Sequence, residues 1–270
     1  MPKTSEKTPF FSIITITLNN VEGLRRTHKS LKKQNFTNFE WIIIDGKSSD
    51  KTLEYLKQSD AKITSEPDAG IYDAMNKGIN KSTGEYLLFL NAGDILCSAD
   101  TLKRIHKASQ DKPDFIYGDS LEASSYKPAR KPDIARGMFT HHQAMLYKRE
   151  ALGGLKYNTA YEIAADYDFT AKFLNPTKTL KYCEFPICDF ELGGISQTKA
   201  ALGRREQFEI RRNLKLVGPI KNYVITALQA ALWTLRCCAP ALYWRLKSSG
   251  NSAPVIAQSD SQHSRLKNPT

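Results

Sequence analysis

The sequence predicts an α/β fold built on a mostly parallel β-sheet. Short runs of apolar and β-branched residues, typical of strands that are buried on both faces, recur along the first 120 residues. Segments with helical periodicity separate these runs. Strands that alternate with helices in this way form βαβ units, and such units assemble into parallel sheets.

The N-terminal part of the predicted sheet comes from three strands and two helices. The strands are expected at 11–18, 39–45 and 61–66, and the helices at 24–34 and 51–58. Leu24 and Leu31 are seven residues apart with basic residues between them, so the first helix is expected on the surface. Asp50 directly precedes the second helix and is its expected N-cap.

The same alternation continues to about residue 192. Helices are expected at 71–82, 99–109 and 165–174, and strands at 85–90, 114–119 and 179–192. The segment 120–140 is rich in Lys, Pro and Arg and is predicted to be a loop. The segment 141–152 is expected to begin as a strand.

The charge of the chain is concentrated at its C-terminal end. The chain has 270 residues, of which 41% are hydrophobic and 25% charged, and these values are typical of a globular protein. Residues 199–270 contain 12 Lys and Arg and three Asp and Glu, a net charge of +9, which leaves only +2 of the total of +11 for residues 1–198. A basic end favours an anionic partner, either nucleic acid or anionic lipid.

The C-terminal segment 222–246 is unusually apolar. It has only two charges, Arg236 and Arg245, and its length alone would permit a membrane span. An Arg near the middle of a span costs about 2.5–3.5 kcal/mol, however. Trp233 and Trp244, with flanking basic residues, suit the membrane interface. We therefore expect a helix that lies on an anionic membrane surface, with a spanning helix and a helix packed on the core as the alternatives.

These features divide the chain into four parts. They are a disordered tail at 1–10, the main domain at 11–213, a helical membrane-associating extension at 214–247 and a disordered tail at 248–270. The first ten residues lack the apolar segment of a secretory signal. The five cysteines match no zinc pattern and are expected to be reduced thiols, although Cys183 and Cys188 could pair. The main domain is therefore expected in the cytoplasm.

Polar side chains follow the end of each of the first five predicted strands. They are Thr17 and Asn19, then Asp45, then Glu66 and Asp68, then Asn91 and Asp94, and finally Asp119. Ligands bind at the carboxyl ends of the strands in an open parallel sheet. Carboxylates gathered there would repel one another unless a cation or hydrogen-bond donors offset their charge, and a divalent metal on a phosphate ligand would do so.

Any one of these strand-end residues could instead be a turn residue. No Walker-type loop and no G-x-G-x-x-G follows the first strand, which excludes those two manners of nucleotide binding.

Several segments of the chain resemble the family 2 glycosyltransferases. They are FSIITITLNN, WIIIDGKSSDKT, SEPDAGIYDAMNKGI and GEYLLFLNAGD, followed by HHQ at 141–143, ADYD at 165–168 and GGIS at 193–196. Each segment alone is a weak signal, but their order and spacing over residues 11–196 are specific. The similarity is greatest to the bacterial branch that builds colanic acid, capsule and lipopolysaccharide sugars. It implies the GT-A fold, a Rossmann-like sheet that binds a nucleotide sugar.

The resemblance also implies which residues bind the nucleotide sugar. They are Thr17, Asn19, Asp45, Asp68, Gly70, Lys77 and Asn91. Asp45 would contact the base, and Thr17 would line the same pocket. The donor is expected to be a UDP-sugar, with guanosine and thymidine diphosphate sugars as the alternatives.

The implied cofactor is Mg²⁺ or Mn²⁺, which the family binds through an Asp-x-Asp motif at the end of the fourth strand. Here the usual Asp-Ser-Asp-Asp becomes Asn91-Ala92-Gly93-Asp94, so glycine stands at the position of the usual metal-binding Asp. We expect Asp94 to bind the metal and the amide oxygen of Asn91 to contribute more weakly. The affinity for the metal would then be lower than in an Asp-rich site, and Asp94 as a plain turn residue is the alternative.

A general base is needed because the attacking hydroxyl is a poor nucleophile with a high pKa. In inverting members of the family this base is an Asp in an acidic pair on a short helix, and the matching segment here is 165–168. The resemblance makes Asp166 the catalytic base, with Ala165 in place of the first acid of the pair. The alternative is that Asp166 only stabilises the helix N-terminus.

The acceptor side of the site is assigned by resemblance to His141, His142 and Gln143. Purely structural histidines are the alternative there, and adjacent histidines on a strand would face opposite sides and could not easily share a metal. The implied acceptor is a growing glycan carried on polyprenyl diphosphate. The basic C-terminal extension would then hold the enzyme at the inner face of the bacterial inner membrane.

Three other functions fit parts of the sequence. A nucleotidyltransferase would share the sheet and the metal, but NNVEG after the first strand lacks the expected glycine-rich basic loop. A nucleic-acid-binding protein would share the basic end, but that end carries a long apolar segment rather than an aromatic platform, so no nucleic-acid partner is expected. A catalytically weakened family member is suggested by Gly93.

Overall fold

The computed structural model describes residues 8–122, 124–174 and 178–239. Its strands are β1 Phe11–Thr17, β2 Phe39–Asp45, β3 Lys62–Ser65, β4 Tyr86–Phe89, β5 Ile95–Leu96, β6 Phe115–Glu122, β7 Ser125–Lys127, β8 Met145–Lys148 and β9 Leu180–Phe190. Its α-helices are α1 Val21–Lys32, α2 Thr52–Leu56, α3 Ile71–Lys81, α4 Thr101–Ala108, α5 Ala165–Phe173, α6 Ile195–Thr198, α7 Ala200–Asn213 and α8 Pro219–Cys238. Three 3₁₀ turns are η1 Ile134–Arg136, η2 His142–Ala144 and η3 Glu150–Leu152. The chain forms two compact units, Met1–Tyr223 and Val224–Thr270.

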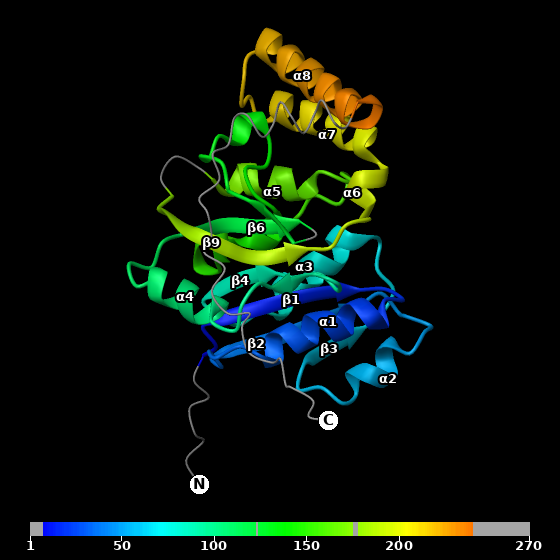
Figure 1. Cartoon of the computed structure of the whole chain (residues 1–270), viewed down its shortest axis with the longest axis vertical. Helices are drawn as coiled ribbons and strands as arrows, with labels where there is room; N and C mark the ends of the chain where they lie inside the picture. Colours follow the sequence, from blue (N-terminus) through cyan, green and yellow to red (C-terminus); the bar gives the residue numbers. More distant parts are fainter. Residues whose placement is uncertain (1–7, 123, 175–177, 240–270) are drawn as a thin grey trace, which may run out of the picture. The chain divides into compact units, whose positions relative to one another are not determined.

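The nine strands of the first unit form one mostly parallel sheet, as predicted. The strand order is β3-β2-β1-β4-β8-β6-β9-β5, and β7 pairs with β6 (Figure 1). Strands β3, β2, β1 and β4 are parallel. Strand β8 is antiparallel to both β4 and β6, and β9 is parallel to β6. The carboxyl ends of β1, β2, β3, β4, β6 and β9 therefore meet at one edge of the sheet, where ligands are expected.

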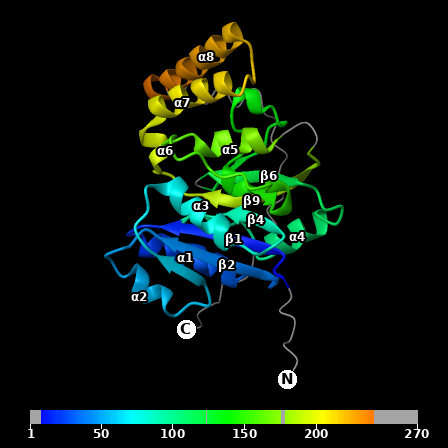
Figure 2. The same ribbon diagram turned by 180° about the vertical axis from the view of Figure 1, so that it is seen from behind.

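Helices cover both faces of this sheet, so its central strands are buried on both sides. Alternate residues of β1 show this: Phe11 and Ile13 pack with α1, α2 and α4 on one face, whereas Ile14 packs with α3 on the other. Helix α5 joins α3 on that second face. Figure 2 shows the same arrangement from behind. Burial on both faces explains why the strands are continuous apolar runs rather than alternating ones.

Two sequence-based expectations about strands are wrong. Asp119 was expected to end a strand, but it lies buried inside β6, which continues to Glu122. Its carboxylate accepts hydrogen bonds from the hydroxyl of Tyr182 at 2.6 Å, the amide of Ala129 at 2.8 Å and the hydroxyl of Tyr126. Because these donors satisfy the buried carboxylate, β6 continues beyond Asp119. Asp119 is therefore not among the residues at the end of its strand.

The segment that starts at 141 was expected to begin as a strand, but it begins as the 3₁₀ turn η2, and β8 starts only at Met145. His141 and His142 are therefore not on a strand, and the expectation that they face opposite sides of one does not apply. Two short strands also escaped prediction. Strand β7 lies within the expected loop 120–140, and β5 has only two residues.

Other predicted features have mixed outcomes. Asp50 was expected to be the N-cap of α2, but the N-cap is Lys51; the Asp50 carboxylate still accepts the amide of Thr52, the first residue of α2, at 2.9 Å. Cys183 and Cys188 are buried free thiols and do not pair. No helix in the described part of the chain is long and apolar enough to cross a membrane. The predicted tail at 248–270 and Trp244 lie outside the described residues, as does most of the tail at 1–10.

A buried carboxylate ties the three central parallel strands together at their amino ends. Glu40 at the start of β2 accepts hydrogen bonds from the Ser12 hydroxyl at 2.5 Å, the Thr83 amide at 2.6 Å and the Gly84 amide at 3.1 Å, and it pairs with Lys62 at 2.7 Å. Burial by itself would raise the pKa of Glu40, but hydrogen bonds from Lys62, Ser12 and Thr83 outweigh it and hold this pKa at about 2. A Cβ at Gly84 would lie 2.7 Å from the Ser12 nitrogen, so only glycine fits at this junction.

We predict that Glu40→Gln lowers the free energy of unfolding by about 2–3 kcal/mol at pH 7, because hydrogen bonds to a charged acceptor are lost. The pKa of Glu40 in the folded chain, about 2, lies below its ordinary value of 4.5. Its stabilising contribution is therefore complete above pH 4.5 and is lost as the pH falls toward 2. Urea unfolding of both proteins at pH 7 and pH 3.5 measures this, with Glu54→Gln on the exposed surface of α2 as the control. If the difference in the free energy of unfolding between the unmodified protein and Glu40→Gln were as large at pH 3.5 as at pH 7, the stabilising role of the ionised Glu40 would be contradicted.

Candidate active site

Thr17 and Asp45 are neighbours at the carboxyl ends of β1 and β2. They are register partners in the parallel ladder. The Asp45 carboxylate is fully buried and accepts hydrogen bonds from the Ser48 amide at 3.1 Å and the Ser65 hydroxyl at 2.6 Å. The hydroxyl of Thr17 is buried and has no hydrogen-bond partner among the described residues. The two residues expected to bind the base are thus brought together, and their role remains a prediction.

Asn19 joins the loops that follow β1 and β2. Its backbone has a positive φ of 49°, a conformation that Asn tolerates better than most residues. Its amide donates to the Ser48 hydroxyl at 2.8 Å, and its side-chain oxygen accepts the Ser49 amide at 2.8 Å. Asn19 therefore shapes the same end of the sheet as Thr17 and Asp45.

The SEPDAG loop lies directly beside this pair. A Cβ at Gly46 would come within 2.7 Å of the Asp68 carboxylate, so Asp68 lies against the residue that follows Asp45. Asp68 also accepts the amide of Gly70 at 3.0 Å, and Gly70 has a φ of 120°, which favours glycine. Lys77 on α3 holds the loop by donating to the Pro67 carbonyl at 2.7 Å and pairing with Glu66 at 3.1 Å.

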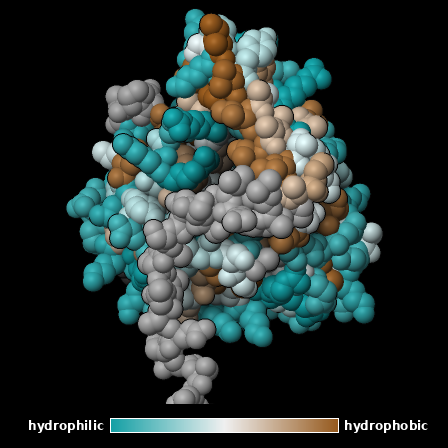
Figure 3. All heavy atoms as spheres, turned by 45° about the horizontal axis from the view of Figure 1, so that its top comes forward, coloured by the Kyte–Doolittle hydropathy of each residue, from teal (hydrophilic) through white to brown (hydrophobic). Residues whose placement is uncertain are grey.

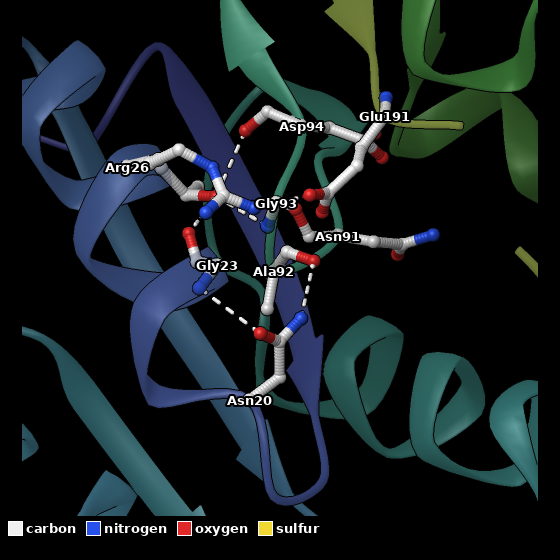
Figure 4. A network of polar contacts seen from close by, with 9 residues as sticks. Asn20, Gly23, Arg26, Asn91, Ala92, Gly93, Asp94 and Glu191 are labelled. Carbon is white, nitrogen blue, oxygen red and sulfur yellow. Dashed lines mark hydrogen bonds and ion pairs between the residues drawn. The ribbon is translucent and has the colours of Figure 1, made fainter. Parts of the chain in front are cut away.

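The Asn91–Asp94 turn after β4 is built around Asp94 (Figure 4). One oxygen of the Asp94 carboxylate accepts the backbone amide of Glu191 at 2.9 Å, and the other accepts the side-chain amide of Gln143 at 2.8 Å. Burial raises the pKa of Asp94 to about 6. Asp94 thus connects its own turn to the end of β9 and to η2, whether or not it also binds a metal.

The oxygen atoms at this turn suit a hard divalent cation. The side-chain oxygen of Asn91 is buried and has no partner in the described part of the chain, and the Glu191 carboxylate lies against Gly93. Amide and carboxylate oxygens are ligands that Mg²⁺ and Mn²⁺ accept. The described residues contain no group of three or more His, Cys, Asp or Glu side chains that could hold a metal ion. A cation here would therefore need further oxygens from a bound ligand.

Asp166, the expected base, is the second residue of α5. Its carboxylate lies 3.6 Å from Nδ1 of His142. Burial raises the pKa of Asp166 to about 6, so the carboxylate is ionised at pH 7. Burial also lowers the pKa of His142 to about 4, so the imidazole is neutral there. A carboxylate with a raised pKa beside a neutral imidazole is suited to take up a proton.

The 3₁₀ turn η2 joins these two sites. Gln143 donates to Asp94 and the preceding residue, His142, faces Asp166. His141 stacks on Phe190, the last residue of β9, with ring centroids 4.6 Å apart. The three residues expected on the acceptor side therefore connect the turn after β4 to α5, although acceptor binding itself remains a prediction.

Sequence reasoning missed Glu206, which fixes the start of α5. Its buried carboxylate on α7 accepts the backbone amides of Glu162 at 2.8 Å, Ile163 at 2.9 Å and Ala164 at 2.8 Å. Helix α5 has no side-chain cap of its own, so Glu206 caps it from another helix. The one sequence signal is that Glu206 lies between Gly203 and Ile210 on the buried stripe of α7, where an acid is unexpected.

The chain also matches known proteins. Residues 12–165 match the family described as Glycosyl transferase family 2. The chain belongs to this family. A PGL/p-HBAD biosynthesis glycosyltransferase of Mycobacterium tuberculosis is 35% identical over 205 residues, which cover 70% of this chain and 80% of the relative. The amylovoran biosynthesis glycosyltransferase AmsB of Erwinia amylovora is 27% identical over 58% of this chain and 62% of that protein. The family and the enzyme class expected from the sequence are thereby confirmed, and the protein is a glycosyltransferase.

Solved structures of low sequence identity confirm the GT-A fold. The S. aureus TarS fragment 1–349 in complex with UDP-GlcNAc superposes with a TM-score of 0.64 at 17% identity, over 82% of this chain and 71% of that one. The mannosyltransferase PcManGT from Pyrobaculum calidifontis, in complex with GDP-Man and Mn²⁺, superposes with a TM-score of 0.62 at 14% identity, over 91% of this chain and 80% of that one. At these identities the likeness concerns the fold.

We predict that Glu206→Gln loosens the start of α5 in this glycosyltransferase. An amide offers one acceptor oxygen in place of two, and its NH₂ group faces backbone donors, so we expect unfolding to cost about 2 kcal/mol less. The amides of residues 162–164 should exchange hydrogen at least about tenfold faster, since 1.4 kcal/mol corresponds to a factor of ten. Hydrogen-exchange mass spectrometry measures this against Glu209→Gln, which lies one turn further along α7. Equal protection in both variants would show that Glu206 does not hold α5.

Proposed function

We propose that this family 2 glycosyltransferase moves a sugar from a nucleoside diphosphate sugar to a hydroxyl group of a growing cell-surface glycan, with inversion at the sugar carbon. The observation that carries the proposal is the link through η2. This turn connects Asp94, at the end of the central strand β4, to Asp166 on α5. A site for the diphosphate and a base for the acceptor hydroxyl would thereby be positioned by two consecutive residues, His142 and Gln143.

The donor would lie along the carboxyl ends of β1, β2 and β4. Asp45 would contact the nucleotide base, with Thr17 and Asn19 lining the same pocket, because Thr17 is the register partner of Asp45 and its hydroxyl has no hydrogen-bond partner among the described residues. Asp68, Gly70 and Lys77 of the adjoining loop and helix would border the nucleotide and the sugar. A UDP-sugar is the favoured donor. The neighbours TarS and PcManGT were solved with UDP-GlcNAc and GDP-Man, so the guanosine alternative is the natural comparison.

The reaction is a displacement at the anomeric carbon. Asp166 takes the proton of the acceptor hydroxyl while the hydroxyl oxygen forms the new bond to that carbon. The bond from the anomeric carbon to the diphosphate oxygen breaks, and the nucleoside diphosphate leaves with the bonding electrons. The neutral His142 beside Asp166 places no positive charge next to it, so the carboxylate keeps its raised pKa and remains an effective base.

A Mg²⁺ or Mn²⁺ ion at the Asn91–Asp94 turn would stabilise the negative charge of the leaving diphosphate as a Lewis acid. Asp94 and Asn91 are the residues at this turn that we expect to contribute ligands. The structure of PcManGT includes Mn²⁺ and so supports a cation in a protein of this fold.

The acceptor would be a lipid-linked glycan at an anionic membrane surface, which we infer from α8. Four of its exposed side chains, Ile220, Val224, Leu228 and Leu232, recur every four residues and so lie on one face of the helix. Figure 3 shows hydrophobic residues gathered in a strip on the surface. Residues 199–270 carry a net charge of +9, which favours an anionic surface. The enzyme would then act on the inner face of the bacterial inner membrane, as a peripheral protein facing the cytoplasm.

We predict that Asp166→Asn lowers kcat at least about 100-fold, because an amide cannot accept the proton. Nucleotide binding should be unchanged, since Asp166 lies on the acceptor side. In the unmodified enzyme kcat/KM should fall as the pH drops through about 6, because protonation of Asp166 removes the base. Release of nucleoside diphosphate from donor and acceptor measures both effects, with Asp60→Asn as an exposed control. Full activity in Asp166→Asn would rule out this base.

We also predict that replacing Val224, Leu228 and Leu232 together by Ser lowers binding to anionic vesicles at least about tenfold, because each buried aliphatic side chain contributes about 1.5–3 kcal/mol. Cosedimentation with phosphatidylglycerol vesicles measures this. The matched control replaces Leu18, Ile63 and Leu180, which are exposed elsewhere, by Ser. Sedimentation of the α8 variant equal to that of the control would contradict the membrane proposal.

A further inference from the structure

The carboxylate of Glu191 occupies the place where a side chain at position 93 would stand. Gly93 has a φ of 113°, a conformation that favours glycine, and a Cβ built on it would lie 1.8 Å from Oε2 of Glu191. No larger residue fits at position 93 while Glu191 keeps this position. The end of β9 therefore delivers a carboxylate to the turn after β4, from a point almost 100 residues later in the chain.

Glu191 is held in this place from two sides (Figure 4). Its backbone amide donates to Asp94 at 2.9 Å, and Asp94 is fixed in turn by Gln143 at 2.8 Å. Its side chain forms an ion pair with Arg26 of α1. The two acids differ in their contacts. Both carboxylate oxygens of Asp94 already accept hydrogen bonds, whereas the carboxylate of Glu191 contacts only Arg26 among the described donors.

The two acids also differ in how well a ligand can reach them. Asp94 is 3% exposed, whereas the side chains of Glu191 and Arg26 are 44% and 49% exposed. Glu191 is therefore the carboxylate at this turn that a bound ligand meets first. An exposed ion pair contributes only about 0–1 kcal/mol to stability, so stability alone gives little reason for this arrangement.

A diphosphate that approached Glu191 directly would be repelled, since both groups are negative. The Arg26–Glu191 pair has no net charge and cannot by itself neutralise the diphosphate. A divalent cation between Glu191 and the diphosphate would remove the repulsion. Mg²⁺ commonly binds in this manner, through one or two carboxylates together with substrate phosphate oxygens and water.

We propose that Glu191 is a ligand of the divalent cation that binds with the nucleoside diphosphate, and that Arg26 is its counter-ion when no cation is bound. Asp94 also positions Glu191, because its carboxylate accepts the backbone amide of that residue. This proposal rests on the proposed function, because it assumes a nucleotide donor at the carboxyl edge of the sheet. It also explains why glycine at position 93 need not mean a weakened enzyme.

The test is calorimetric titration of UDP, GDP and TDP into the full chain, with and without MnCl₂. Mn²⁺ should raise the affinity of the unmodified protein for one nucleotide. Glu191→Gln should reduce this gain at least about tenfold, the scale of losses at metal sites. Without Mn²⁺ the same variant should bind the nucleotide at least as tightly as the unmodified protein, because a repulsive charge is gone. If Glu191 had a merely structural role, its replacement would weaken nucleotide binding both with and without Mn²⁺.

Two further variants sharpen the test. Arg26→Gln removes the counter-ion and should keep the Mn²⁺ gain, whereas Glu54→Gln on α2 is the neutral control. An unchanged gain in Glu191→Gln would overturn the proposal and leave Asp94 as the ligand. Nucleotide binding that ignores Mn²⁺ in the unmodified protein and is lost in Arg26→Gln would also overturn it, since Arg26 would then carry the charge. Absence of binding of all three nucleotides to the unmodified protein would instead contradict the proposed function.

Discussion

The parallel pairing of β1 with both β2 and β4 is the constraint on which the rest of the structure depends. Because these strands are buried on both faces, a slip of one residue would exchange the faces of every side chain in the slipped strand, and the register is strongly specified. The same register places Thr17 opposite Asp45 and brings the Asn91–Asp94 turn to the same edge. Glu40 secures the opposite edge, where Ser12, Lys62 and the backbone before β4 meet its carboxylate.

The chemistry at the carboxyl edge is assembled from distant segments through buried acids. Asp94 gathers the end of β9 and η2 around the turn after β4, and Glu206 holds the start of α5 from α7. Each acid is satisfied by backbone or side-chain donors, as buried charges must be. Asp166 also accepts a backbone amide, that of Tyr167 at 2.8 Å, but burial outweighs this hydrogen bond and raises the pKa of Asp166 to about 6.

Much of the fold could be predicted from local patterns. The strand β2 is predicted to the residue, and β1, α3 and α5 to within one residue at either end, because their apolar periodicity and turn residues act locally. The errors occur where tertiary contacts override the local signal. Asp119 stays within β6 because its carboxylate accepts hydrogen bonds from Tyr126 of β7 and from Tyr182, which lies 63 residues later in the chain. For the same reason no sequence pattern links Glu191 to Gly93, or Glu206 to α5.

The most direct test of the nucleotide site is hydrogen-exchange mass spectrometry of the unmodified chain with UDP, GDP or TDP and Mn²⁺. The structure predicts that one nucleotide slows exchange in the peptides that cover 45–49, 65–70 and 91–94, since these loops lie together at the carboxyl edge. The basic region after residue 199 provides an internal reference, because its hydrogen exchange should not change when the nucleotide binds. Protection confined to that basic region, with none at the three loops, would contradict a nucleotide-sugar site at the edge of the sheet.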